Sequence, residues 1–171
     1  IKTLLPIVNF INSNYEIPIS IDTRSSKVAI AFENKNIQFI NDVSSGFHDS
    51  NMLNTVSKLG CAFIMTHMPR EHKEGKVKVF GNILTEINEY FIERIESCKK
   101  AGIEKDKLII DPGVGFGKSG EDNITLLNNI ESLKRVHENV CVGSSNKRYS
   151  SRLFENIQTK EDLKIANLAT F

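Results

Sequence analysis

Short apolar runs rich in β-branched residues alternate with longer segments at helical spacing, and this alternation repeats about five times along the chain. The apolar runs, which we predict to be strands, are residues 18–22, 37–41, 61–65, 107–111 and 139–143. The helical segments are residues 2–11, 25–33, 50–58, 82–100, 123–134 and 160–169. Apolar strands that are each followed by a crossover helix are typical of a parallel sheet buried between helices, so the pattern predicts the α/β class.

The longest helical segment, residues 82–100, has a clear amphipathic pattern. Ile83, Ile87 and Phe91 recur on one side at a spacing of four residues, and acidic residues such as Glu89 occupy the other side. The Ala101-Gly102 pair that follows predicts the end of this helix, because glycine readily takes the left-handed conformation of a C-cap.

The pattern alone fits either an open doubly wound sheet or a closed (β/α)8 barrel. A complete barrel takes about 250 residues, whereas this chain has 171. Five strands that begin and end with helices would form the middle of such a barrel. We therefore expect one domain, residues 1–171, that is part of a barrel. Because the chain starts at Ile1 and its first methionine is Met52, we also expect further sequence upstream.

Charge and composition narrow the kinds of partner. The chain has 22 Lys plus Arg against 21 Asp plus Glu, with no long run of one sign. This balance argues against nucleic acid or an anionic membrane as the main partner and favours a small ligand. No apolar stretch is long enough to span a bilayer, and no signal-peptide pattern is visible. The three cysteines are widely spaced, so they predict neither a disulfide framework nor a paired metal site and fit a reducing compartment.

Polar residues stand at or just after the carboxyl end of every predicted strand. In parallel α/β folds the ligand site lies at these ends, so we expect the residues to converge on one pocket. They are Asp22, Thr23, Arg24, Asn41, Asp42, Thr66, His67, Asp111, Ser145, Asn146 and Lys147. Asp42 has a second interpretation, since an Asp after a strand often caps the next helix and its neighbours Ser44 and Ser45 also look like turn residues.

Two carboxylates at strand ends suggest the chemistry of the ligand. Asp22 and Asp111 each end an apolar run, and a partly desolvated carboxylate is normally retained only where donors satisfy it. A carboxylate accepts two parallel N–H bonds, Asn41 supplies a donor and an acceptor, and Lys147 supplies a cation. A flat heterocycle with an amino-pyrimidinone edge matches this set.

The glycine-rich segment 111–118 is the most specific stretch. Gly113, Gly115 and Gly117 allow positive φ and close backbone approach, and Phe116 offers a flat apolar face. The glycine spacing matches neither the dinucleotide fingerprint nor the Walker phosphate loop. HExxH and GxSxG are also absent, so a zinc protease or a serine hydrolase is not indicated. The charged stretch 70–78 is expected to be a solvated loop, with a cover for the pocket as the alternative.

The stretches 19–23, 40–44, 64–68, 110–118 and 142–147, in this order and spacing, resemble the dihydropteroate synthase family over essentially the whole chain. The resemblance implies an incomplete (β/α)8 TIM barrel of the pterin-binding superfamily, covering about strands three to seven. It also implies the family's reaction in folate biosynthesis: (7,8-dihydropterin-6-yl)methyl diphosphate condenses with para-aminobenzoate to give 7,8-dihydropteroate and diphosphate.

The resemblance further implies roles for individual residues. The pterin ring would be held by Asp22, Asn41, Asp111 and Lys147, with Gly115 and Phe116 as the adjoining wall. The para-aminobenzoate side would include Ser145 and Asn146. Asp22, Asp111 and Lys147 are the expected catalytic residues, which would orient the ring and stabilise positive charge as the diphosphate leaves.

The sequence also departs from the family pattern. Asn146 stands where the family has arginine, and Thr66 stands where it commonly has methionine. The family's first two strands and last strand have no counterpart here, so this chain is expected to hold no metal ligand, and the Mg2+ ligand would come from the missing N-terminal part. The family further implies a cytoplasmic homodimer and a sulfonamide target. Two alternatives stay open: a degenerate or fragmentary non-catalytic pterin-binding homologue, and a methyltetrahydrofolate-binding methyltransferase.

Overall fold

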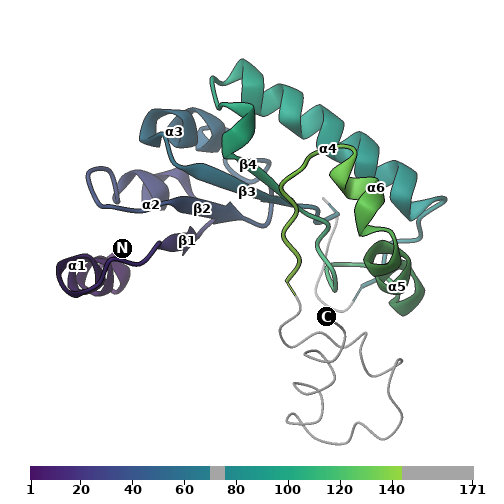
Figure 1. Ribbon diagram of the computed structural model, residues 1–171, viewed down its shortest axis with the longest axis horizontal. Coiled ribbons are helices and arrows are strands. Elements are labelled where there is room, and N and C mark those ends of the chain that lie inside the picture. Colours follow the sequence, from purple (N-terminus) through teal and green to yellow (C-terminus); the bar gives the residue numbers. More distant parts are fainter. Residues whose placement is uncertain (70–75, 144–171) are drawn as a thin grey trace, which may run out of the picture.

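The structure is a computed structural model that describes residues 1–69 and 76–143. One parallel sheet forms its centre, with the strands in chain order: β1 (Ser20–Asp22), β2 (Phe39–Asp42), β3 (Ala62–Thr66) and β4 (Leu108–Asp111). The helices are α1 (Leu4–Asn14), α2 (Ser26–Ile30), α3 (Met52–Leu59), α4 (Ile83–Lys100), α5 (Gly120–Asn128) and α6 (Ile130–Lys134), and a 3-10 turn, η1 (Lys105–Lys107), precedes β4. This order confirms the predicted α/β class (Figure 1).

The two faces of the sheet differ in what covers them. In Figure 1, α3 and α4 lie over one face. Side chains on that face are fully buried, among them Ile40, Phe63 and Ile110, and each contributes roughly 1.5–3 kcal/mol by leaving water. Because side chains alternate along a strand, Asn41 and Asp111 lie on the opposite face, where they are only half-buried.

The predicted fifth strand is shorter in the structure. Val140 forms a single parallel bridge to Ile110, and the two backbone hydrogen bonds beside it join Ile110 N to Asn139 O (3.0 Å) and Cys141 N to Ile110 O (2.9 Å). The segment therefore pairs in a parallel register without extending into a strand among the described residues. The predicted helix 160–169 lies outside those residues.

The predicted helix 123–134 is interrupted. It divides into α5 and α6 at Asn129, whose backbone leaves helical geometry and whose side-chain amide donates to Thr125 O at 2.8 Å. The start of α5 was also misplaced, because Ser119 and Asp122 form a capping box that begins the helix at Gly120.

The long helix α4 agrees with its prediction. Asn82 caps its first turn by accepting from Thr85 N at 3.1 Å, and Gly102 follows its end with a φ of +85°. Within the described ranges 1–69 and 76–143, no helix has the length and apolar character needed to cross a membrane.

Candidate active site

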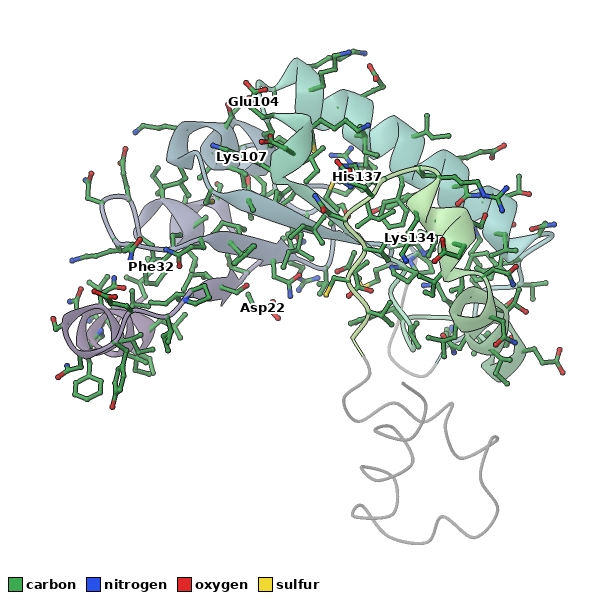
Figure 2. The ribbon with its side chains drawn as sticks, viewed as in Figure 1. Asp22, Phe32, Glu104, Lys107, Lys134 and His137 are labelled. Atoms are coloured by element: carbon green, nitrogen blue, oxygen red, sulfur yellow. The ribbon has the colours of Figure 1, made fainter. Side chains whose placement is uncertain are left out.

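Asp22 and Asn41 lie side by side on the half-open face of the sheet. The two residues are directly opposite each other in the β1–β2 register, and Asn41 Nδ2 donates to Asp22 Oδ2 at 3.4 Å. Figure 2 shows Asp22 on the side of the sheet away from α3 and α4. The other amide atom, Asn41 Oδ1, is buried and has no hydrogen-bond partner among residues 1–69 and 76–143. This amide can therefore accept one more hydrogen bond at the face that carries Asp22.

Asp111 ends β4 on the same face. Its Oδ1 accepts from Gly113 N at 2.8 Å, and a Cβ built on Gly143 would be 3.8 Å from its Oδ2. The bridge between Ile110 and Val140 brings Cys141 opposite Asp111. Cys141 is exposed, but partial desolvation raises the pKa of its thiol and the negative charge of Asp111 also raises it, so the thiol stays protonated near neutral pH.

The glycine-rich loop after Asp111 is fixed by two contacts with the end of β3. Gly113 has a φ of +68°, and a Cβ added there would come within 2.0 Å of His67 O. Lys118 is buried, and its Nζ donates to three carbonyl oxygens: His67 (3.0 Å), Gly113 (2.9 Å) and Phe116 (3.2 Å). Lys118 thus supports the loop and does not extend into solvent toward a ligand.

Asp42 serves the turn rather than the pocket. Its carboxylate is fully buried and accepts from Ser44 N (2.7 Å), Ser44 Oγ (2.6 Å) and Gly46 N (2.8 Å). These contacts confirm the turn interpretation, but Asp42 caps no helix, because the next helix, α3, begins at Met52 after Asn51. Thr66 is also buried, and it stands opposite Asp111 in the β3–β4 register.

The structure brings together part of the predicted set. Asp22, Asn41 and Asp111 share one sheet face, and Gly115 and Phe116 follow in the loop after β4. The expectation that Asp22 is partly desolvated is wrong for the described residues. It is exposed, because β1 is an edge strand of the described sheet and no helix covers its inner face. Ser145, Asn146 and Lys147 lie outside the described residues.

Sequence reasoning missed two residues at this site. One is Cys141, whose wide spacing from the other cysteines excludes a disulfide or paired metal site, but whose position two residues before Gly143 in an alternating segment indicates the inner face. The other is Lys118, which the glycine-rich motif contains without indicating its partners. Its bonding to His67 O depends on a contact between residues 51 positions apart, which no local pattern reveals.

The described residues do not form a metal site. Within ranges 1–69 and 76–143, no three His, Cys, Asp or Glu side chains gather as metal ligands do. A magnesium ion therefore does not fit the acidic residues of this part of the chain, and no chemical step below depends on one.

Comparison with known proteins identifies the family. A family model described as "Pterin binding enzyme" matches residues 1–171. The chain belongs to the pterin-binding enzyme family. Dihydropteroate synthase from Escherichia coli strain K12 is 30% identical over 164 residues, which are 95% of this chain and 57% of that protein. The chain thus spans little more than half the length of such relatives.

Solved structures of this family have the same fold. Dihydropteroate synthase of Xanthomonas albilineans with 4-aminobenzoic acid has a TM-score of 0.86 at 30% identity, and the match covers 96% of this chain and 58% of that one. The same enzyme in complex with 7,8-dihydropteroate has a TM-score of 0.84, with 99% and 61% covered. The four-stranded arc is therefore part of the family's TIM barrel, and these relatives do not favour the methyltransferase alternative.

Proposed function

We propose that the inner face formed by Asp22, Asn41 and Asp111 is the pterin-binding half of a dihydropteroate synthase site. The observation that supports this most is Asn41 Oδ1, which is buried beside the Asp22 carboxylate and has no partner within the described part of the chain. Leaving a buried acceptor unpaired costs about 1–3 kcal/mol, so a ligand that donates to it recovers that energy. The solved relatives bound to 4-aminobenzoic acid and 7,8-dihydropteroate support the same ligand class.

Each side chain has a distinct part in recognising the ring. The carboxylates of Asp22 and Asp111 accept hydrogen bonds from the amino and ring N–H groups of the pterin, and Asn41 Oδ1 accepts one more. Gly115 and Phe116 provide the adjoining wall, and Lys147 contacts the ring edge. Fixing the ring in this way directs its methylene carbon toward the second substrate.

The reaction then proceeds by substitution at that carbon. The C–O bond to diphosphate breaks with its electron pair on oxygen, and the pterin delocalises the resulting positive charge. The amine lone pair of para-aminobenzoate forms the new C–N bond, and the nitrogen loses a proton to water. The carboxylates of Asp22 and Asp111 stabilise the cation electrostatically, since they lie at the sheet face that holds the ring.

As part of this proposal, the complete protein is a cytoplasmic homodimer that produces dihydropteroate for folate synthesis and is inhibited by sulfonamides. Ser145 and Asn146 contact para-aminobenzoate, and Mg2+ binds through ligands outside the described residues. Its main partners are these small molecules rather than nucleic acid or membrane, in line with the net charge of +1.

The test is calorimetric titration of the chain with a pterin analogue. We expect binding that Asp111→Asn weakens roughly tenfold to a hundredfold, because a donor edge is left without its acceptor. Asp106→Asn is the matched control, since Asp106 is exposed in the turn η1 just before β4, away from the end that carries Asp111. A folded chain that binds no pterin analogue, or equal affinities in the two variants, would refute the assignment.

The activity itself is tested in a barrel completed with the missing strands. That protein should release diphosphate only when para-aminobenzoate is present, and Asp111→Asn should abolish the release. Full activity in the Asp111→Asn variant would contradict the role given to this carboxylate.

A further inference from the structure

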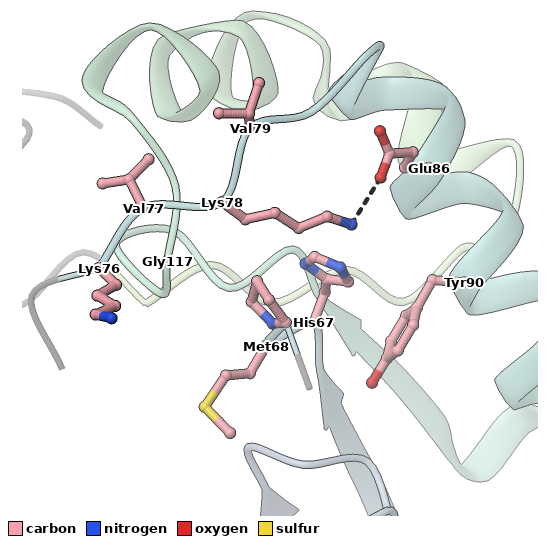
Figure 3. Close-up of a pocket in the computed structure, with 10 residues that line it drawn as sticks. His67, Met68, Lys76, Val77, Lys78, Val79, Glu86, Tyr90 and Gly117 are labelled. Atoms are coloured by element: carbon pink, nitrogen blue, oxygen red, sulfur yellow. Dashed lines mark hydrogen bonds and ion pairs between the residues drawn. The ribbon is translucent and has the colours of Figure 1, made fainter. Parts of the chain in front are cut away.

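A cavity of about 590 Å³, separate from the inner face of the sheet, lies between the end of β3 and the first turns of α4. It is lined by His67, Glu86 and Tyr90 but not by Asp22, Asn41 or Asp111. The alternation of β3 explains the separation: Thr66 stands opposite Asp111 on the inner face, so the next residue, His67, turns toward the helix layer. Figure 3 shows His67 between the side chains of Lys78 and Met68, with Tyr90 nearby.

His67 is a buried polar side chain with an unsatisfied atom. It is 5% exposed, and its Nδ1 has no partner in the described part of the chain. Its backbone is held at both ends, because His67 N donates to Asp111 O at 2.8 Å and His67 O accepts from Lys118 Nζ. The Tyr90 ring packs edge-on against it, with centroids 4.7 Å apart. The imidazole is thus fixed in place with one hydrogen-bonding position unused.

The charges around His67 are mainly positive. Burial, together with the positive charges of Lys118 and Lys78, lowers its pKa to about 3, so the ring is neutral at physiological pH. The one carboxylate among the described lining residues, Glu86, is already bound to Lys78 Nζ (2.8 Å) and Gly81 N (2.9 Å). Lys76 adds an exposed cation at the rim. Among the described lining residues no carboxylate other than this paired Glu86 is present, so an anionic ligand would meet no second carboxylate there.

The remaining walls are apolar. Val77 and Val79 are 56% and 92% exposed, an unusual degree for valine, and Met68 also lines the cavity. A volume of this size is within the range of small-molecule sites. We propose that the cavity binds a small organic anion, with its carboxylate or phosphoryl group beside His67 and Lys78 and its apolar part against Met68 and Val77.

The test follows the His67 ring by NMR in the 171-residue chain, titrated separately with benzoate and with inorganic phosphate. We expect saturable shifts of the imidazole resonances. Lys78→Gln should weaken binding about tenfold, the usual effect of losing one charged contact. Glu86→Gln should strengthen it, because Lys78 loses its competing carboxylate. Lys99→Gln removes an exposed charge at the far end of α4, the helix that carries Glu86, and should leave the affinity for both probes unchanged.

The two probes separate the possible sources of the anion. Tighter binding of benzoate identifies an organic carboxylate that uses the apolar wall, and tighter binding of phosphate identifies a phosphoryl group. The absence of saturable shifts with both probes overturns the inference. Equal weakening by Lys78→Gln and Lys99→Gln also overturns it, since the attraction would then be general to the surface. Neither outcome depends on pterin binding at the inner face.

Discussion

Replacing Gly113 with alanine should separate the ends of β3 and β4. At φ = +68° the alanine side chain costs about 1–2 kcal/mol by itself. Its Cβ would also come within 2.0 Å of His67 O, so the two backbones must move apart by roughly 1.5 Å to reach ordinary contact. That movement breaks the bond from Lys118 Nζ to His67 O and weakens the bond from His67 N to Asp111 O.

The magnitude follows from these parts. A hydrogen bond to a charged donor contributes about 1.5–3 kcal/mol and a neutral one about 0.5–1.5 kcal/mol. The backbone cost and the contributions of these two hydrogen bonds add up, so Gly113→Ala should lower the free energy of unfolding by about 3–6 kcal/mol. The loss of unfolded-state entropy on adding a methyl group offsets less than about 1 kcal/mol of this.

Gly60→Ala is the matched control for this experiment. Gly60 has nearly the same backbone angle, φ = +65°, but its added Cβ would meet only Lys107 Nζ at 3.8 Å. This variant should therefore lose only the backbone cost of about 1–2 kcal/mol. Urea unfolding of both variants measures the difference, provided that the m-value is unchanged. Losses that agree within about 0.5 kcal/mol would refute the close approach of Gly113 to His67.

Three further predictions test the surroundings of the site. Lys118→Met should lower the free energy of unfolding by roughly 2 kcal/mol or more, because three carbonyl acceptors lose a buried cation, whereas exposed Lys134→Met should cost well under about 1 kcal/mol in the same denaturation assay. Between pH 6.5 and about 3 the unfolded state binds more protons at His67 than the folded state. The free energy of unfolding should therefore decrease as the pH is lowered through this range, by up to about 1.4 kcal/mol per pH unit. His67→Phe should flatten that slope, and an unchanged slope would contradict the neutral imidazole. Alkylation followed by mass spectrometry should modify Cys141 before the two buried cysteines, and Asp111→Asn should accelerate it. An unchanged rate in that variant would argue against their proximity.

Local patterns predicted the strands and their polar ends well. The run that ends at Asp111 is apolar and β-branched, and the carboxylate marks its carboxyl end whatever the final topology. The same holds for Asn41 near the carboxyl end of β2. Because parallel strands align their carboxyl ends, the grouping of these residues on one face followed from the order of elements alone.

Other features depend on contacts between distant segments. The sequence indicates that Gly113 permits unusual backbone angles, but the need for glycine there arises from His67 O, which lies just after strand β3. The exposure of Asp22 likewise reflects which strands flank β1, a property of the sheet rather than of the run that contains it. The interruption at Asn129 depends on a side chain competing for a backbone carbonyl, which helical periodicity does not record.

The paired ends of β3 and β4 serve both sides of the sheet at once. Asp111 directs its carboxylate to the inner face, while its carbonyl accepts from the backbone of His67, whose ring lines the outer cavity. Side-chain changes therefore separate the two sites: Asp111→Asn should affect only the inner face, and Lys78→Gln only the cavity. Gly113→Ala moves the backbone that both share, so it should impair pterin binding and anion binding together. Loss of one without the other would mean that the two strand ends move independently.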